Sequence, residues 1–237
     1  MTNALYRDDA YMKSCETTVV RHDNQGIVLA DTVFYAMGGG QPGDTGVIRR
    51  ADGTEIQIVD TRKHKDEPTM IIHIPVEGSA ILKAGESVIA KIDWERRYKH
   101  MRMHTSLHLL SAVVPFGVTG GAIHDDKSRL DFDMQEIMDK EDITKKLNVL
   151  IQASHPVNTQ WITDEELDAQ PELIKTMSVK PPRGAGKVRL LDIPGVDLQP
   201  CGGTHVANTN EIGPMVIKKV EKKGKHNRRV IVTFASD

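Results

Sequence analysis

Two short pairs of potential metal ligands place the strongest constraint on how this chain can fold. His104 and His108 stand four residues apart, and so do Cys201 and His205, far downstream. Together they offer three imidazoles and one thiolate, a ligand set that suits zinc. Because the two pairs are distant in sequence, a folded domain has to bring them together, unlike the ligands of a local zinc finger. We therefore expect one zinc ion per chain, bound where the two segments meet.

The first pair lies in a segment that is predicted to be helical. Residues 94–112 contain neither proline nor glycine, and Asp93 before them is a typical N-cap. On such a helix His100, His104 and His108 share one face. Either adjacent pair could bind one ion, but all three could not, because His100 and His108 lie roughly 12 Å apart along the axis. The spacing leaves both pairs open, and ordinary hydrogen-bonded histidines are the alternative.

The second pair lies in a segment that cannot be a stable helix. Pro200 and the glycines at 202 and 203 break it, so its ligands must converge through a turn. Glycine permits positive φ and lets the backbone come close to a metal or a substrate. We therefore expect Gly202, Gly203 and Thr204 to contribute to the site. A plain turn would explain this stretch better if it stood alone, but the helix histidines favour metal binding.

Composition limits the possible classes of protein. The 237 residues carry a formal net charge of −2, with 39% hydrophobic and 27% charged residues, as in an ordinary soluble globular protein. This balance excludes a basic nucleic-acid coat but allows a local basic patch. No apolar run approaches the roughly 18–20 residues of a membrane helix, so no membrane association is expected. With only Cys15 and Cys201, a disulfide framework is excluded and a cytoplasmic location is predicted.

The chain is predicted to be α+β, with a change of character near residue 92. Residues 1–92 show short apolar stretches separated by turns, a pattern typical of a small β-barrel-like domain. The expected strands are 17–21, 27–30, 46–48, 55–59, 70–74 and 87–92.

Residues 93–237 are predicted to form a second, zinc-containing domain. After the helix at 94–112, a further helix is expected at 141–153, and a short one after Thr163, where Glu166 completes a capping box. Helices and strands do not alternate regularly, which favours an α/β two-layer domain, with helices on a mostly antiparallel sheet. Its expected strands are 129–133, 157–162, 188–191 and a final hairpin within 215–234.

The context of both ligand pairs resembles a known family. The stretches 102–110 and 200–206 are similar to the editing domain of alanyl-tRNA synthetases and to the free-standing AlaX editing proteins. The Gly-rich stretch 34–46 resembles a motif of the longer members, and 118–121 followed by 129–133 extends the match. The resemblance covers about residues 31–215, and this length has no room for an aminoacylation domain. The chain is therefore similar to a medium-length, free-standing member.

The resemblance implies a function and a set of site residues. It implies hydrolysis of the ester that joins a wrong amino acid, chiefly serine or else glycine, to the tRNA for alanine. It assigns the metal to His104, His108, Cys201 and His205, which leaves out His100. Thr105 is the nearest hydroxyl for contacting the substrate, and its alternative is a bond back to the helix backbone. The synthetase domain has a glutamine after its zinc helix where this chain has 118–121, so its role would fall to backbone groups or Thr119.

The Gly-rich loop is a candidate for amino-acid discrimination. Its residues Gly38, Gly39, Gly40 and Gln41 lack the Lys and Ser/Thr of a phosphate-binding loop, so no nucleotide cofactor is expected. The resemblance places the loop over the editing pocket, where its backbone could sense a serine hydroxyl. A flexible connection between strands is the alternative.

The last hairpin carries the densest positive charge and is the predicted surface for tRNA. The aromatic content of 4% argues against base stacking as the general mode of recognition, and favours contact with the backbone of a folded RNA. A zinc-stabilised RNA-binding module without catalysis, and a metallohydrolase of small esters or amides, are the alternative functions. The basic residues expected to contact tRNA are Lys218, Lys219, Lys222, Lys223, Lys225, Arg228 and Arg229.

Overall fold

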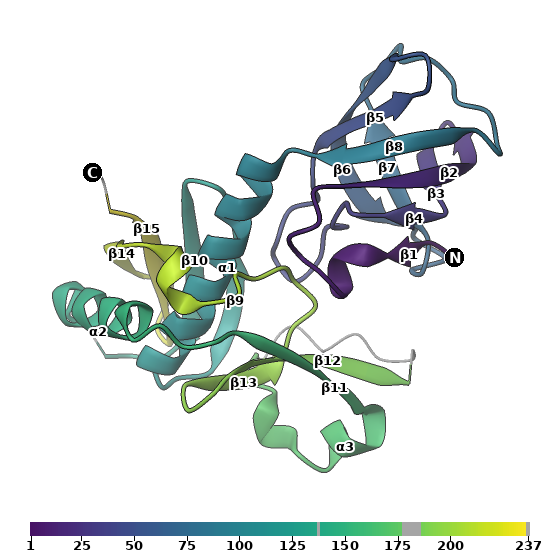
Figure 1. Cartoon of the computed structure of the whole chain (residues 1–237). Coiled ribbons are helices and arrows are strands. Elements are labelled where there is room, and N and C mark those ends of the chain that lie inside the picture. Colours follow the sequence, from purple (N-terminus) through teal and green to yellow (C-terminus); the bar gives the residue numbers. More distant parts are fainter. Residues whose placement is uncertain (137, 177–185, 236–237) are drawn as a thin grey trace. The chain divides into compact units, whose positions relative to one another are not determined.

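The chain forms two compact units, Met1–Tyr98 and Lys99–Asp237, each with its own core. The computed structural model (Figure 1) describes residues 1–136, 138–176 and 186–235. The division falls within helix α1 (Trp94–Val113), a few residues after the predicted change of character at residue 92. Among the described residues, no helix is both long enough and apolar enough to cross a membrane.

The first unit is a closed antiparallel barrel of six strands. The strands follow the order β2-β3-β7-β6-β5-β8, and β8 pairs back with β2, which leaves no open edge. The predicted β-barrel is therefore confirmed, and every expected strand is present. The observed bounds are β2 Ser14–Asp23, β3 Gly26–Leu29, β5 Gly46–Arg50, β6 Glu55–Lys63, β7 Ile71–Pro75 and β8 Ser87–Ile92.

Every second side chain of a barrel strand points inward, and these side chains fill the barrel interior. In β6, Ile56 and Ile58 point inward while Gln57 between them faces solvent, as a strand with one buried face requires. Ile27 and Leu29 of β3 and Phe34 join them in the core with no exposed surface. The minor elements β1 (Asn3–Ala4), β4 (Asp31–Thr32) and η1 (Leu5–Arg7) were not predicted, since two- and three-residue elements leave no periodic signal.

A buried ion pair fastens the Gly-rich segment to the first turn of α1. Arg97 is fully buried and donates to the carboxylate of Asp44, through Nε at 2.8 Å and also through Nη2. Asp44 also accepts from the backbone N–H of Tyr35 at 2.7 Å. The other guanidinium donors reach the carbonyls of Val33, at 2.6 Å, and Ala10, at 3.0 Å. Because the charges are paired and hydrogen-bonded, this burial is tolerated, and removal of either partner would leave the other uncompensated.

The second unit contains two antiparallel sheets (Figure 1). The mostly antiparallel α+β arrangement is confirmed, although the sequence suggested one sheet where two are observed. The four-stranded sheet has the order β14-β15-β10-β9, and the three-stranded sheet has the order β11-β12-β13. The bounds are β9 Val118–Ala122, β10 Lys127–Asp133, β11 Asn158–Thr163, β12 Lys187–Ile193, β13 Asp197–Pro200, β14 Met215–Lys222 and β15 Asn227–Phe234.

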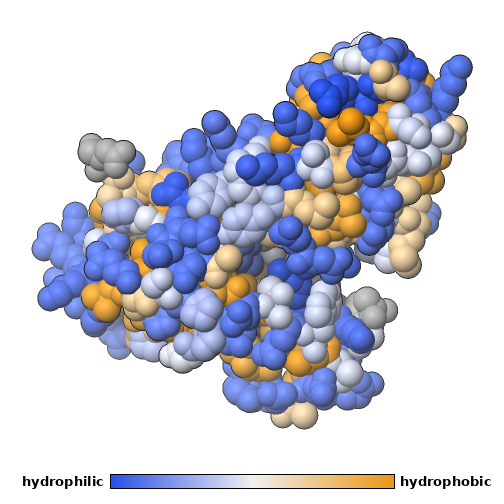
Figure 2. All heavy atoms as spheres, viewed as in Figure 1, coloured by the Kyte–Doolittle hydropathy of each residue, from blue (hydrophilic) through white to orange (hydrophobic). Residues whose placement is uncertain are grey.

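The helices α2 and α3 of this unit begin at N-cap residues whose side chains accept hydrogen bonds from the first turn. At the start of α2 (Lys140–Gln152), Asp139 accepts from the backbone N–H groups of the first turn. Its residues Ile143, Leu147 and Ile151, spaced by four, are buried, while its outer face is largely hydrophilic (Figure 2). The short α3 (Asp164–Asp168) starts with the predicted capping box, because Thr163 and Glu166 each accept from the other's backbone N–H. A short η2 (Pro171–Leu173) follows it, and η3 (Thr209–Ile212) precedes β14.

Two strands of the second unit were missed by the sequence reasoning. The stretch 118–121 was not among the expected strands, but it forms β9 against β10. A Cβ at Gly121 would lie 3.0 Å from the Leu130 side chain, so glycine serves close packing there. The stretch 197–200 was interpreted as part of a turn because of Pro200, which ends the edge strand β13.

Candidate metal centre

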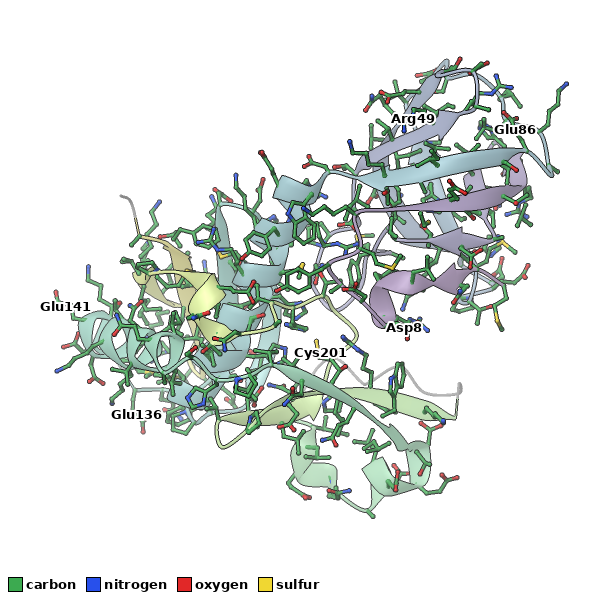
Figure 3. The ribbon with its side chains drawn as sticks, viewed as in Figure 1. Asp8, Arg49, Glu86, Glu136, Glu141 and Cys201 are labelled. Atoms are coloured by element: carbon green, nitrogen blue, oxygen red, sulfur yellow. The ribbon has the colours of Figure 1, made fainter. Side chains whose placement is uncertain are left out.

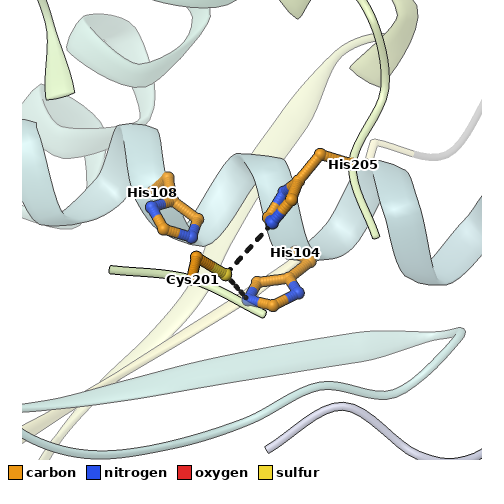
Figure 4. Close-up of side chains that lie close together, drawn as sticks. All are labelled: His104, His108, Cys201 and His205. Atoms are coloured by element: carbon orange, nitrogen blue, oxygen red, sulfur yellow. Dashed lines mark hydrogen bonds between the residues drawn. The ribbon is translucent and has the colours of Figure 1, made fainter. Parts of the chain in front are cut away.

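Helix α1 and the segment after β13 bring the four predicted ligands together within the second unit. Cys201 lies between α1 and the three-stranded sheet (Figure 3). His104 and His108 project from α1 beside it (Figure 4). One potential ligand atom from each of His104, His108, Cys201 and His205 lies within 4.8 Å of all the others (Figure 4). The three histidines are buried and Cys201 is partly exposed. His100 does not belong to this group, so the structure itself selects the downstream histidine pair.

The geometry fits a tetrahedral metal ion. The Sγ atom of Cys201 lies 3.2 Å from Nε2 of His205 and 3.6 Å from Nε2 of His104. A tetrahedral centre with bonds of about 2.0–2.3 Å holds its ligand atoms roughly 3.3–3.8 Å apart. The ring centroids of the three imidazoles are 4.4 to 5.3 Å apart. The group could therefore hold a metal ion.

The electrostatics of the cluster favour the metal-binding protonation states at Cys201 and His205 and oppose it at His108. Burial raises the pKa of the Cys201 thiol, but the neighbouring imidazoles outweigh it and hold the pKa well below the usual value. Burial lowers the pKa of His205 to about 3, so its ring is neutral and keeps a lone pair. Burial also opposes the charge on His108, yet the Cys201 thiolate and the Asp197 carboxylate raise its pKa to about 9. Metal binding to the free cluster therefore requires release of a proton from His108.

A carboxylate behind the cluster orients His108. Asp197, at the start of β13, accepts from Nδ1 of His108 at 2.8 Å, from Lys175 Nζ at 2.5 Å and from Gln199 Nε2 at 2.7 Å. Burial raises the pKa of Asp197, but these donors, His108 foremost, lower it below the usual value. Fixing the proton on Nδ1 directs Nε2 of His108 to the cluster, as carboxylate partners of metal-bound histidines commonly do.

Thr105 contacts the outer ring nitrogen of His205, as Asp197 does that of His108. Its hydroxyl donates to the carbonyl of Met101 at 2.9 Å, the bond back to the helix that was the alternative to substrate contact. The same oxygen lies 3.2 Å from Nδ1 of His205 and accepts from the backbone N–H of Val206 at 3.3 Å. Thr105 is fully buried and holds the ring of His205 in place. Direct contact with a substrate stays a prediction.

The turn that carries Cys201 is held by the neighbouring strand. Arg189 of β12 donates from Nη1 to the carbonyls of Cys201, at 3.2 Å, and Gly203, at 2.8 Å. The backbone N–H of Gly203 points at the Cys201 sulfur, 3.4 Å away. Neither Gly202 nor Gly203 has positive φ, so a left-handed backbone is not the reason for glycine here, and close approach of the backbone to a substrate stays a prediction. A Cβ at Gly202 would meet nothing within 4 Å, which leaves this side of the turn open, while Thr204 is fully buried.

The supporting residues were missed by the sequence reasoning. Asp197 and Gln199 precede Cys201 by four and two residues, so on a strand all three side chains share a face. Recognition of β13 would have pointed to both of them. Arg189 and Lys175 leave no comparable signal, because their partners are distant in sequence.

The Gly-rich loop forms a tight turn in the first unit. Gly38 and Gln41 exchange backbone hydrogen bonds of 3.1 and 3.0 Å around Gly39 and Gly40, whose φ angles are +57° and +82°. Positive φ at both central positions is typical of the tightest hairpin turns and requires glycine-like residues. Tyr35 braces the turn by donating to the carbonyl of Gly38 at 2.8 Å. Gln41 is fully buried, so only the Gly39–Gly40 tip is exposed.

The two arginines of the basic hairpin differ from their predicted role. Arg228 is buried and donates to the carbonyls of Gln135 and Asn227, while Arg229 forms a two-point ion pair with Asp131, at 2.8 and 2.9 Å. Both arginines therefore stabilise the four-stranded sheet. The five lysines remain exposed, and two of them, Lys219 and Lys223, form ion pairs with Glu221 at 2.7 and 3.0 Å. The other three are Lys218, Lys222 and Lys225.

Family models match both parts of this architecture. Residues 188–231, which include Cys201 and His205, match the threonyl and alanyl tRNA synthetase second additional domain. Residues 6–96, which span the barrel, match the class II (A) tRNA synthetases. Both matched segments are therefore similar to parts of tRNA synthetases.

Individual relatives show to which family the chain belongs. The chain is 38% identical over 245 residues to the alanyl-tRNA editing protein AlaX-M of Methanosarcina acetivorans, with 99% of both chains covered. It is 35% identical over 237 residues to AlaX-M of Saccharolobus solfataricus, with coverage of 98% and 99%. It is also 36% identical to the alanine–tRNA ligase of Sulfurisphaera tokodaii, covering 93% of this chain and 25% of the ligase. The chain belongs to the AlaX-M family of alanyl-tRNA editing proteins, which confirms the resemblance drawn from its motifs.

We predict that metal content depends on the cluster and on Asp197. The double substitution Cys201→Ala with His205→Ala should abolish stoichiometric metal, because it removes half of the ligands. Asp197→Asn should weaken metal affinity roughly 10- to 100-fold, the usual effect of removing such a carboxylate partner. Elemental analysis and competition with a chelator measure both effects. His100→Gln, on the same helix but outside the cluster, is the matched control and should retain the metal, and full metal in the double variant would reject the site.

Proposed function

We propose that this protein is a trans-editing hydrolase that removes serine, and secondarily glycine, from mischarged tRNA for alanine. The observation that supports the proposal most strongly is the convergence of His104, His108, Cys201 and His205 into one largely buried group. It occurs in a chain whose relatives, over nearly the full length of both chains, are named alanyl-tRNA editing proteins.

The proposed metal is zinc, one ion per chain. Magnesium and calcium require oxygen ligands, whereas three imidazoles and one thiolate suit zinc. When bound, zinc would supply a Lewis acid able to polarise the ester carbonyl or lower the pKa of a water molecule. The chain's own residues hold the cluster in position, Asp197 through His108 and Thr105 through His205.

The open side of the Cys201 turn is the proposed entrance for the acyl ester. Cys201 is the one partly exposed member of the cluster, and Gly202 next to it is exposed with open space around its α-carbon. We infer that the backbone at Gly202 and Gly203 lies against the ester, where no side chain obstructs its approach. Thr204 is buried, so a contact between its hydroxyl and the substrate requires access from within the pocket.

Deacylation of charged tRNA tests this function. The wild-type protein should hydrolyse seryl-tRNA for alanine faster than correctly charged alanyl-tRNA, and His104→Ala should abolish the turnover together with the metal. Release of radiolabelled amino acid is the measurement. Retained tRNA binding without turnover would instead indicate an RNA-binding module, and turnover of small esters alone would indicate a general metallohydrolase.

The tip of the Gly-rich turn is proposed to contribute to amino-acid discrimination. An apolar pocket separates serine from alanine poorly, while a site that hydrogen-bonds the hydroxyl can prefer serine, because alanine leaves its polar groups unpaired. The exposed backbone at Gly39 and Gly40 can supply such groups, and Gly38 and Gln41 hold the turn in shape.

We predict that side chains added at the tip reduce the serine preference. Asn tolerates positive φ, so Gly39→Asn with Gly40→Asn should keep the turn but obstruct its backbone. Seryl-tRNA hydrolysis, or its preference over alanyl-tRNA, should fall roughly 3- to 10-fold, the value of about one hydrogen bond, with metal retained. Gly53→Asn, at a similar φ of +87° in the same unit, is the matched control. An unchanged rate and preference in the double variant would make the turn only a connector.

We predict that tRNA binding depends on the exposed lysines of the β14–β15 hairpin. Lys222→Ala with Lys225→Ala should weaken binding and reduce the slope of its salt dependence by about 0.9 for each phosphate that the variant no longer neutralises, because fewer counterions are released. Binding curves at several salt concentrations measure the slope. Lys65→Ala with Lys83→Ala removes the same charge from exposed barrel positions and should change the slope less. The reverse order of effects would move the RNA surface to the barrel.

A further inference from the structure

An exposed tryptophan lies in line with the Cys201 ligand across the three-stranded sheet. Trp161 of β11 pairs with Arg189 of β12. The backbone N–H of Cys201 donates to the carbonyl of Arg189 at 3.0 Å, which extends the Leu190–Pro200 pairing by one residue. The three residues therefore form one row that crosses β11 and β12 and ends just after β13. With neighbouring strands about 4.8 Å apart, the backbones of Trp161 and Cys201 are roughly 10 Å apart.

Trp161 is on the same face of the sheet as the metal centre. Directly paired residues of antiparallel strands project to one face. On this face Gln199 and Asp197 contact each other behind His108, and Arg189 reaches the carbonyls of the Cys201 turn. The opposite face packs in a separate apolar cluster, whose members include Ile162, Val188, Leu190, Leu198 and Leu167 of α3.

The surroundings of Trp161 differ from those of the other tryptophan. Trp94 stacks on Tyr98 with ring centroids 5.4 Å apart, and Lys13 lies 4.8 Å above its ring. In the parts of the chain that the structure describes, no such ring or cation contact involves Trp161, whose surface is 47% exposed. A large rigid ring at a partly exposed strand edge, beside a buried polar site, is suited to stacking on a planar ligand.

We propose that Trp161 stacks on the unpaired terminal base of the acylated RNA strand. The proposal rests on the proposed function and adds to it a nucleobase-binding position. The amino acid is esterified to the terminal sugar, so the base on that sugar cannot be far from an ester held at the cluster. A row of roughly 10 Å leaves room for the sugar between Cys201 and Trp161. A single stacking position also agrees with the low aromatic content, which argues only against stacking of many bases.

Fluorescence tests the stacking without any reaction. In the Trp94→Phe variant, Trp161 is the only tryptophan, so its emission reports directly on its ring. Titration with an uncharged RNA minihelix that ends in an unpaired adenosine should quench the emission. An otherwise identical minihelix whose last nucleotide lacks its base should bind more weakly and quench little. Equal quenching by both RNAs, or by neither, would overturn the proposal.

Kinetics with the same two RNAs separate stacking from a structural role. Trp161→Leu should lower kcat/KM for the seryl minihelix roughly 5- to 100-fold, with Trp161→Phe in between, because stacking on one base contributes about this much. In Trp161→Leu, removing the terminal base from the RNA should no longer lower kcat/KM. Thr159→Ala, exposed on the same face of β11, is the control and should match the wild type. A base-removal penalty that persists in Trp161→Leu would assign base recognition elsewhere.

The two experiments keep this proposal separate from the proposed function. If the wild-type protein does not hydrolyse acylated RNA, the editing function fails, while the quenching titration still decides whether Trp161 binds the terminal base. Metal content of each variant shows whether the cluster remains intact, so a folding defect is distinguished from the absence of stacking.

Discussion

The contact between helix α1 and the turn after β13 is the interaction on which the second unit's chemistry depends. It joins two imidazoles of α1 to Cys201 and His205 in a buried group. Such a group is costly to bury without compensation. Hydrogen bonds to Asp197 and Thr105 fix the outer nitrogens of His108 and His205. The short distances from the Cys201 sulfur to two of the imidazoles are those that a bound cation would stabilise.

Much of the fold could be predicted from local patterns. The barrel strands alternate apolar and polar residues, α1 lacks helix breakers, and the Thr163–Glu166 capping box is a local signal. The strands β9 and β13 were missed, because Gly120-Gly121 and Pro200 favour a loop when sequence neighbours alone are considered. In the folded chain both stretches pair as strands, and Gly121 packs closely against Leu130.

The residues that cluster were predicted, but the residues that support the cluster were not. Spacing identified the pairs of ligands, whereas Arg189 and Lys175 act on partners that only the fold brings near. The ion pair of Arg229 was missed for the same reason, because its partner Asp131 is distant in sequence. A run of positive charge predicts a surface, yet Arg229 is satisfied by Asp131 from a neighbouring strand. For Thr105 the sequence left two interpretations, contact with the substrate or a bond to the helix backbone. The bond to the helix backbone is observed, and the hydroxyl also contacts His205.

The most direct test of the metal centre is X-ray absorption spectroscopy on the purified protein at the zinc edge. A centre formed by His104, His108, Cys201 and His205 predicts one sulfur at about 2.3 Å and nitrogens at about 2.0–2.1 Å, with imidazole scattering beyond them. A spectrum without a sulfur neighbour, or a protein that takes up no zinc, would contradict it.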